Sequence, residues 1–223
     1  MNDQFLHIHT LGCQPYTEVW QRMQRLTTSR TAETADALWL CSHPATFTQG
    51  QAGKPEYVKQ LGNIPLVQTD RGGQVTYHGP GQLIVYPLID LTRKKIGVKA
   101  FVALLEQTAQ ALLADFGISA ETKQGMPGLY VNHQKIASLG LKIKQGCSYH
   151  GIALNIDMDL EPFQRITPCG LSGRQVTQWR DHATLPDWSV ICDHFTMHFS
   201  QLLNYTHTTH YSQESPWHCP TSP

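Results

Sequence analysis

The sequence of 223 residues is poor in charged side chains and lacks a long apolar run. Charged residues make up 15% of the chain, against about 25% in typical soluble domains. The 17 basic and 17 acidic side chains balance, which argues against a general nucleic-acid binder. The longest apolar stretch, 83–89, contains Pro87 and is far shorter than the about 20 residues that span a bilayer. Residues 1–14 contain Asp3 and lack the apolar segment of a signal peptide, so we expect a cytoplasmic protein with no nucleic-acid or membrane partner.

Cysteine pairs at the spacing of a metal site are also missing. The six cysteines lie far apart without a CxxC pair, and in the absence of a secretion signal we interpret them as thiols. Twelve histidines raise the question of a metal. The pairs His7–His9 and His207–His210 have no cysteine or carboxylate nearby that would complete a ligand set. We interpret His7 and His9 as the polar face of a strand, and predict no metal site.

Three common catalytic signatures are absent as well: the phosphate-binding P-loop, the dinucleotide-binding glycine fingerprint and the Gly-x-Ser-x-Gly nucleophile motif. Hydrophobic periodicity predicts instead one domain of mixed strands and helices. One expected helix begins at Pro15, and two others cover 98–116 and 187–203. The expected strands are 5–11, 37–41, 65–69, 82–89, 128–131, 135–143 and 148–158.

The order of these elements indicates the fold class. Consecutive strands at 128–158 predict antiparallel hairpins, whereas the helix after residue 89 predicts a crossover connection. We therefore expect an α/β domain, residues 1–205, with a mixed β-sheet flanked by helices. Residues 206–223 have no apolar face, and we expect a flexible tail there.

The most unusual segment is 69–82, which contains four glycines together with Arg71 and His78. Glycines allow a backbone to approach a ligand closely and to present N–H groups to it. A tight hairpin between two strands explains the same composition, and composition alone does not decide between the two.

Three further segments carry chemistry. Lys135 begins an expected strand, where a lysine is usually solvated. Glycine and alanine interrupt the β-rich run 150–156, which indicates close packing against the backbone. Cys169 lies between Pro168 and Gly170 in a polar loop, where a cysteine is a better nucleophile candidate than in a core.

Taken together, the segments 71–82, 135–140, 150–155 and 168–171 resemble four motifs of the lipoyl(octanoyl) transferases, in the same order. The resemblance covers about residues 5–205. It implies the α/β catalytic domain that biotin and lipoate protein ligases share. It also implies transfer of an octanoyl group from octanoyl-acyl carrier protein to a lysine of lipoyl domains, without a cofactor. The implied acceptors are the lipoyl domains of 2-oxoacid dehydrogenases and the glycine cleavage H protein.

The resemblance also assigns residues. Cys169 matches the family's nucleophile and Lys135 its partner, which would stabilise the thiolate and later accept a proton from the attacking lysine. Small residues such as Gly151 and Ala153 would leave room for the acyl chain. The residues expected to line the substrate site are Arg71, Gly72, Gly73, Gln74, Val75, Thr76, Tyr77, His78, Ser138, Leu139, Gly140, Gly151, Ile152 and Ala153.

Three alternatives stay open. These alternatives are an ATP-dependent lipoate protein ligase, an octanoyl transferase between lipoyl domains, and a non-enzymatic lipoyl-domain binder or metal-binding module. The pair Lys135 and Cys169 argues against the ligase, which needs no catalytic thiol. For docking of acidic partners we expect a basic patch at Lys142 and Lys144 or at 93–95.

Overall fold

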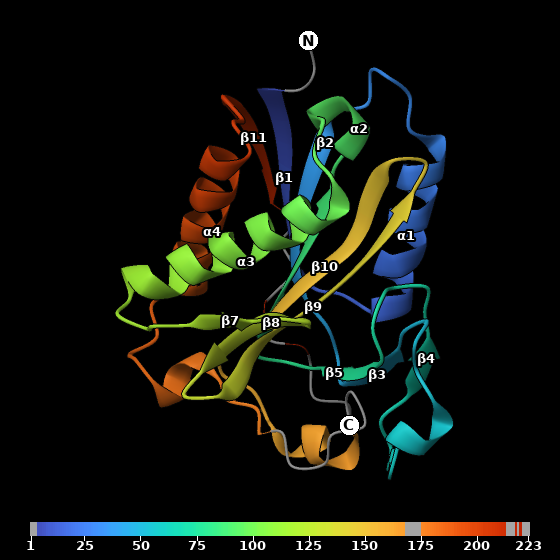
Figure 1. Cartoon of the computed structure of the whole chain (residues 1–223), viewed down its shortest axis with the longest axis vertical. Helices are drawn as coiled ribbons and strands as arrows, with labels where there is room; N and C mark the ends of the chain where they lie inside the picture. Colours follow the sequence, from blue (N-terminus) through green and yellow to red (C-terminus); the bar gives the residue numbers. More distant parts are fainter. Residues whose placement is uncertain (1–3, 168–174, 213–216, 218, 220–223) are drawn as a thin grey trace.

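The computed structural model describes residues 4–167, 175–212, 217 and 219. Figure 1 shows a large twisted sheet with helices packed against it and a small sheet at one end. No helix in the described part of the chain is long and apolar enough to cross a membrane.

The large sheet has eight strands within the described residues, in the order β11-β1-β2-β6-β10-β9-β8-β7. Strands β11, β1 and β2 run parallel and the remaining neighbours pair antiparallel, so the predicted mixed sheet is confirmed. The hairpins predicted at 128–158 are β8–β9 and β9–β10. The strands are β1 (Phe5–Cys13), β2 (Asp36–Ser42), β6 (Gln82–Leu88), β7 (Glu121–Lys123), β8 (Met126–Val131), β9 (Gln134–Lys144), β10 (Cys147–Asn155) and β11 (His207–Ser212).

The small sheet contains β3 (Thr46–Gln49), β4 (Leu66–Gln68) and β5 (Val75–His78), in the order β4-β3-β5. The sequence predicted loops at β3 and β5, and this was wrong. All four residues of β3 are buried although three of them are polar, so no alternation of apolar and polar residues marked the strand. Its two threonines find partners inside the fold: Thr46 donates to the Pro44 carbonyl at 2.9 Å, and Thr48 accepts from Arg71 as described below.

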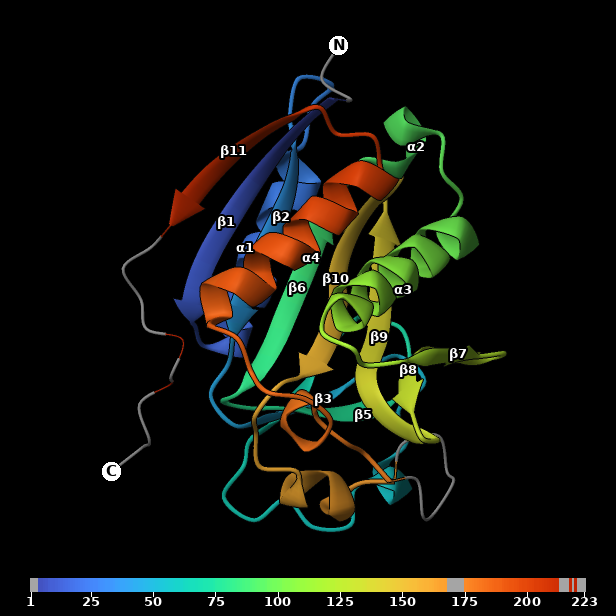
Figure 2. The same cartoon turned by 90° about the vertical axis from the view of Figure 1, so that its left-hand side faces the viewer.

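Helices cover both faces of the large sheet (Figure 2). Helix α1 (Tyr16–Ser29) packs on one face through Tyr16, Val19 and Met23, at the predicted spacing of three and four residues. Helices α3 (Val98–Asp115) and α4 (Trp188–Leu202) pack on the other face around the main core. The short helices are α2 (Leu91–Lys94), η2 (Pro55–Tyr57), η3 (Glu161–Arg165) and η5 (Trp179–Asp181).

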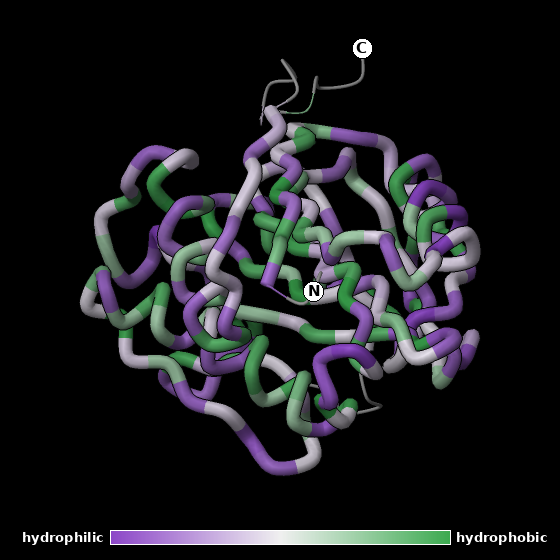
Figure 3. The backbone as a smooth tube through the Cα atoms, turned by 90° about the horizontal axis from the view of Figure 1, so that it is seen from above, coloured by the Kyte–Doolittle hydropathy of each residue, from purple (hydrophilic) through white to green (hydrophobic). Residues whose placement is uncertain are grey.

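The two cores follow from this layering. One lies between the sheet and helices α3 and α4, the other between the sheet and α1. A third apolar cluster joins the small sheet to η3. In Figure 3 the apolar stretches run through the interior, while the most hydrophilic stretches lie at the periphery. Helix α3 also carries the chain from β6 to the far edge of the sheet, which confirms the predicted crossover.

The expectation of a flexible tail is wrong for the described residues beyond 206. Residues 207–212 form β11, which pairs parallel to β1. The Trp217 ring stacks on Trp188 with 4.9 Å between ring centroids, and Cys219 forms a disulfide with Cys13 at the end of β1. The interpretation of all six cysteines as thiols is therefore also wrong. An exposed edge strand is held by backbone hydrogen bonds, so it needs no apolar face that a sequence pattern would reveal.

The strand face predicted for His7 and His9 is confirmed. The two rings lie 6.5 Å apart between centroids, and both contact Tyr211 of β11. They form an aromatic patch on β1 and β11.

Candidate active site

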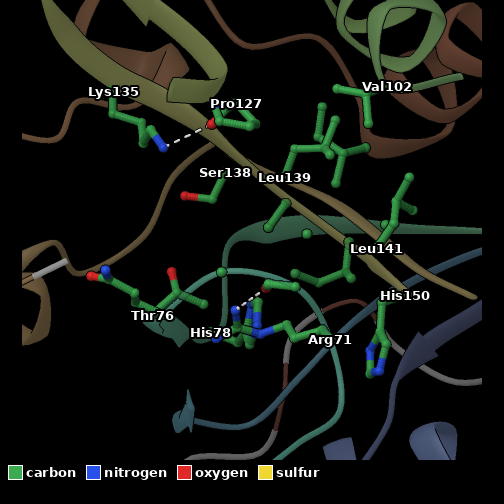
Figure 4. Close-up of a pocket in the computed structure, with 18 of the residues that line it drawn as sticks. Arg71, Thr76, His78, Val102, Pro127, Lys135, Ser138, Leu139, Leu141 and His150 are labelled. Atoms are coloured by element: carbon green, nitrogen blue, oxygen red, sulfur yellow. Dashed lines mark hydrogen bonds between the residues drawn. The ribbon is translucent and has the colours of Figure 1, made fainter. Parts of the chain in front are cut away.

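A pocket of about 350 Å³ lies between the large and the small sheet. Its walls come from β6, β9 and β10 of the large sheet, from β5 and the loop before it, and from the first turns of α3. Figure 4 shows Lys135 and Ser138 toward one end of the pocket and Leu141 and His150 toward the other. The pocket is mainly apolar, with a few polar groups at defined places, as is typical of small-molecule sites.

Thirteen of the fourteen residues predicted to line the substrate site do line this pocket. The exception is Tyr77, which is buried on the other side of β5. Its ring packs between Phe47 and Phe163, 5.5 and 5.4 Å away between ring centroids. Neighbouring residues of a strand point to opposite faces, so β5 presents Thr76 and His78 to the pocket and Tyr77 to a core.

Arg71 holds the glycine-rich loop in place. Its Nη2 donates to the Thr48 carbonyl at 2.6 Å and to the Thr48 hydroxyl at 2.9 Å, and its Nε donates to the same hydroxyl at 3.1 Å. Burial lowers the pKa of this guanidinium, which nevertheless stays charged because an arginine pKa begins so high. Arg71 thus ties the loop to β3 and places a buried positive charge at the pocket wall.

The glycines of the loop permit its close approach to β9. The Gly72 N–H donates to the Leu141 carbonyl at 2.8 Å, so this donor is already used within the fold. A Cβ on Gly140 would lie 2.8 Å from the Gly72 carbonyl oxygen, which excludes a side chain there. Gly73 has φ of +82°, a conformation that favours glycine. The interpretation of the segment as a tight hairpin between its flanking strands was wrong, because β4 and β6 belong to different sheets and β5 pairs with β3. The loop before β5 lines the pocket.

Gly151 is required by the packing of the sheet. A Cβ at this position would lie 1.9 Å from the Val85 carbonyl oxygen of the neighbouring strand β6. The glycine therefore lets β10 approach β6, and this packing alone accounts for it. That its small size also leaves room for an acyl chain stays a prediction. Ala153, on the same strand, lines the pocket.

Lys135 lies at the rim of the pocket, beside a bulge in β9. The register between β8 and β9 shifts here, since Tyr130 pairs with Lys135 but Leu129 pairs with Ala137. Bulges of this kind redirect side chains and interrupt the simple alternation expected for the strand. The Lys135 Nζ donates to the Pro127 carbonyl at 2.9 Å and lies 5.4 Å from the Tyr130 ring centroid. These contacts hold the ammonium at the pocket wall.

Cys169, the predicted nucleophile, lies outside the described residues. The chain on either side of it is placed. The Thr167 N–H donates to the Tyr57 carbonyl at 2.8 Å. The Lys135 N–H donates to the Gln175 carbonyl at 3.1 Å, and the Thr177 N–H donates back to the Lys135 carbonyl at 3.0 Å. The segment that contains Cys169 therefore rejoins the described fold beside Lys135.

His78 and His43 are two buried imidazoles beside the pocket, with 6.0 Å between their ring centroids. His78 Nδ1 lies 2.8 Å from the Gln82 amide oxygen, so this nitrogen carries the proton and Nε2 is an acceptor. His43 Nδ1 donates to the Gln14 carbonyl at 2.6 Å, and its Nε2 accepts from the Tyr86 hydroxyl at 2.8 Å. Burial lowers the pKa of His43 to about 4, and burial together with the neighbouring His43 lowers the pKa of His78 well below its ordinary value. Both rings are therefore neutral at pH 7.

Asp70 organises a second polar cluster. Its carboxylate accepts hydrogen bonds from His150 Nε2 at 2.8 Å, from Trp20 Nε1 at 2.9 Å and from the Tyr149 hydroxyl. Burial alone would raise its pKa, but these donors hold the pKa of Asp70 well below its usual range. Burial lowers the pKa of His150, whose Nδ1 is buried and has no partner among the described residues. His150 lines the pocket and was not predicted to, although it begins one of the four motifs.

Other lining residues were missed because their position depends on how separate elements pack together. They are Ile84, Tyr86, Val98, Val102, Gly125, Met126, Pro127, Lys135, Leu141, Phe163 and Val176, of which only Lys135 had been assigned another role. Val98 and Val102 are four residues apart on α3 and lie beside its core-facing stripe, which is the signal that could have marked them. In the described part of the chain, no metal-ligand cluster lies among the pocket residues.

Comparison with known proteins places the chain in a family. The family model of the lipoyl protein ligase A/B catalytic domain matches residues 15–200, and the chain belongs to this family. Among curated relatives, the octanoyltransferase of Shewanella sp. (strain W3-18-1) is 52% identical over 211 residues, which are 95% of this chain and 97% of the relative. The resemblance seen in the four motifs is confirmed, and so is the class of acyltransferase.

Solved structures agree on the fold. Lipoate-protein ligase A bound with ATP superposes with a TM-score of 0.73 at 16% identity, over 93% of this chain and 89% of that chain. A bi-partite lipoate protein ligase from Thermoplasma acidophilum gives 0.72 at 14% identity, over 95% and 87%. Biotin protein ligase from Aquifex aeolicus matches with a TM-score of 0.50. At these identities the likeness concerns the fold alone, and it confirms the fold predicted from the sequence.

Proposed function

We propose that the protein transfers an octanoyl group from octanoyl-acyl carrier protein to the target lysine of lipoyl domains, through a thioester on Cys169. The observation that carries the proposal is the apolar pocket, which brings the glycine-rich loop, Ser138–Gly140 and Lys135 together in a chain 52% identical to an octanoyltransferase. The acceptors would be lipoyl domains of 2-oxoacid dehydrogenases and the glycine cleavage H protein, and the site would act in the cytoplasm.

In the first half-reaction the Cys169 thiolate attacks the carbonyl carbon of the donor thioester. A new C–S bond forms to Cys169, and the bond to the carrier's sulfur breaks, so the sulfur leaves as a thiolate and takes up a proton. Exchange between two thioesters is nearly balanced in free energy, so the acyl group can wait on the enzyme between two protein partners. The Lys135 ammonium at the rim would stabilise the attacking thiolate.

In the second half-reaction the amine of the acceptor lysine attacks the acyl-enzyme. An amide bond forms, the C–S bond to Cys169 breaks, and the amine loses one proton. Lys135 in its neutral form would accept this proton. Its hydrogen bond to the Pro127 carbonyl fixes the position of Nζ but leaves Nζ able to exchange protons with a substrate.

The glycine-rich loop would stabilise the oxyanion of both tetrahedral intermediates. Gly72 is excluded as a donor because its N–H binds the Leu141 carbonyl. In the described part of the chain the N–H groups of Gly73 and Gln74 have no acceptor, and both residues line the pocket. These two are the donors we assign to the oxyanion.

The pocket suits a short acyl chain. Its volume of about 350 Å³ lies near the lower end of the range for small-molecule sites, about 300–1,000 Å³. Val102, Leu139 and Leu141 supply apolar wall, and each buried CH₂ group contributes about 0.8 kcal/mol. An eight-carbon chain therefore gains enough from burial to be selected over a much shorter one.

Docking of acidic partners is assigned to β9. Two residues of the basic run 93–95 are engaged within the fold: Arg93 donates to Asp36 Oδ1 at 2.6 Å, and Lys94 donates to the Leu203 carbonyl at 3.0 Å. Lys142 and Lys144 lie on the exposed part of β9, where they donate to Gln51 and Thr28. Opposite charge there would steer a carrier or lipoyl domain toward the pocket.

Intact mass spectrometry tests the proposal. Mixing the protein with octanoyl-acyl carrier protein should add one octanoyl group, located on Cys169 by peptide analysis, and a lipoyl domain should then remove it. Octanoylation of the lipoyl domain that requires free octanoate and ATP, with pyrophosphate exchange and no adduct on the protein, would establish the ligase alternative instead. Equal rates from an octanoylated lipoyl domain would favour transfer between lipoyl domains.

A further inference from the structure

Asp115, His194 and His198 form a cluster on the outer side of the helix pair α3–α4. The three side chains present their donor atoms within 4.8 Å of one another. Asp115 is the last residue of α3, while His194 and His198 are four residues apart on α4 and so share one face of the helix. Figure 2 shows the two helices side by side.

The cluster is already arranged around one point. Asp115 Oδ2 lies 2.7 Å from His194 Nδ1 and 2.7 Å from His198 Nε2. The His194 ring also packs against Phe116, with 5.1 Å between centroids, and Phe116 belongs to the margin of the main core. The side chains are 17–35% exposed, so an ion can enter from solvent while the ligands stay supported.

We propose that Asp115, His194 and His198 bind a divalent transition-metal ion such as Zn²⁺. Two imidazole nitrogens and one carboxylate oxygen are ligands that zinc takes in proteins at about 2.0–2.2 Å, and three protein ligands leave a position for water. In a tetrahedral site with such bonds the donor atoms lie roughly 3.4 Å apart, so each nitrogen must move away from Asp115 Oδ2 by about 0.7 Å from its present 2.7 Å. Each imidazole N–H proton shifts to the other ring nitrogen when the ion binds.

The site is separate from the acyl pocket. Val102, the pocket residue of α3 nearest to Asp115 in sequence, precedes it by thirteen residues, which corresponds to roughly 20 Å along a helix. The ion would therefore join the C-terminal end of α3 to the middle of α4 and stabilise the helix layer, without taking part in acyl transfer. Histidine pairs two or three residues apart do not reveal this cluster in the sequence. His194 and His198 are four residues apart, and only a helix brings them together.

Zinc titration of the metal-free protein by calorimetry tests the proposal. The wild type should bind one Zn²⁺ per chain at this site, and Asp115→Asn, His194→Gln and His198→Gln should each weaken binding by at least about tenfold. His133→Gln is the matched control, because His133 is an exposed histidine outside the cluster, and it should bind zinc like the wild type. Zinc should also raise the melting temperature of the wild type and of His133→Gln, but not of His198→Gln.

Cobalt distinguishes this site from the thiols of the chain. Co²⁺ bound to two imidazoles and a carboxylate gives ligand-field bands without the intense near-ultraviolet thiolate charge-transfer band. Circular dichroism of the three variants, which replace partly exposed side chains by amides of similar size, should match the wild type. A thiolate band in the cobalt spectrum, no zinc binding by the wild type, or equal zinc binding by wild type and all three variants would each overturn the proposal.

Discussion

The His150 imidazole, which lines the pocket, donates its Nε2 proton to the Asp70 carboxylate across 2.8 Å. A carboxylate only accepts hydrogen bonds, so this contact fixes the tautomer and leaves Nδ1 of His150 as a buried acceptor. Asp70 comes from the loop before β5 and His150 from β10, so one carboxylate couples the small sheet to the large one.

Replacement of Asp70 by asparagine tests how much this coupling stabilises the fold. Asp70→Asn should lower the free energy of unfolding at pH 7 by about 1.5–3 kcal/mol, the usual contribution of hydrogen bonds to a charged group. The folded-state pKa of Asp70 is lowered, so its stabilisation is complete above the unfolded pKa, about 3.9, and is lost as the pH falls below that value. Urea unfolding from pH 7 to pH 3 should show the difference between variant and wild type shrinking in acid. A difference that stays constant would contradict the prediction.

His43 predicts a second pH dependence at less acidic values. Its pKa is lowered to about 4 in the folded state, against about 6.5 in the unfolded chain. The unfolded state therefore binds a proton that the folded state refuses, and the free energy of unfolding falls as the pH drops from about 6.5 to about 4. His43→Gln keeps a donor and an acceptor and should reduce this slope by close to one proton. A slope in His43→Gln equal to that of the wild type would contradict the prediction.

The sequence predicted the elements that are long and carry an apolar pattern. Helices α1, α3 and α4 bury regular apolar stripes, and strands β6, β9 and β10 contain apolar and β-branched runs, so the sequence reports their existence. Strands β3, β5 and β11 were missed because they are short or lack an apolar pattern. The buried residues of β3 include polar ones that find partners only in the folded chain, and β11 is exposed throughout. The Cys13–Cys219 disulfide joins residues 206 positions apart, a separation that no local pattern encodes.

The candidate site was predictable to the extent that it is built from contiguous motifs. Residues 71–76 and 138–140 line the pocket because each segment runs along its wall. Val98 and Val102 enter the wall from a helix whose position across the sheet depends on tertiary packing. Gly151 illustrates a different ambiguity, because a glycine in a strand indicates close approach but does not tell whether a ligand or, as strand β6 does here, another strand approaches.

Two substitutions distinguish a residue that is needed for strand packing from one that limits the size of the pocket. Gly151→Ala places a methyl group against the Val85 carbonyl, so it should lower the free energy of unfolding by about 1–3 kcal/mol and reduce transfer of all acyl chain lengths alike. Val102→Phe fills the pocket from a partly exposed helix position, so it should preserve stability and shift preference from octanoyl toward shorter acyl groups. Thermal unfolding and single-turnover rates with four-, six- and eight-carbon donors check both. A chain-length shift in Gly151→Ala would show instead that the small size of Gly151 leaves room for the acyl chain.

The Cys13–Cys219 disulfide predicts which cysteines react with an alkylating reagent. Without reductant, denaturation and alkylation should modify four of the six cysteines, and peptide mapping should recover Cys13 joined to Cys219. Cys219→Ser should lower the free energy of unfolding by about 2–4 kcal/mol under oxidising conditions, since a cross-link restricts the unfolded chain. The same variant should match the wild type once reductant is present. Six alkylated cysteines in the unreduced protein would contradict the pairing.

Lys135 gives the sharpest test of the proposed chemistry, because two separable steps depend on it. Lys135→Ala should slow formation of the Cys169 acyl-enzyme most below neutral pH, where an unassisted thiol is largely protonated, and alkaline pH should partly restore that step. Lys135→Arg keeps the positive charge at the pocket rim but cannot act as a base, because a guanidinium stays charged. It should therefore preserve acyl-enzyme formation better than transfer to the lipoyl domain, which needs a proton acceptor. Single-turnover measurement of each half-reaction in both variants decides this. Unimpaired deacylation in Lys135→Arg would restrict Lys135 to an electrostatic role and direct the search for the base to His78, whose ring is neutral and whose Nε2 is an acceptor beside the same pocket.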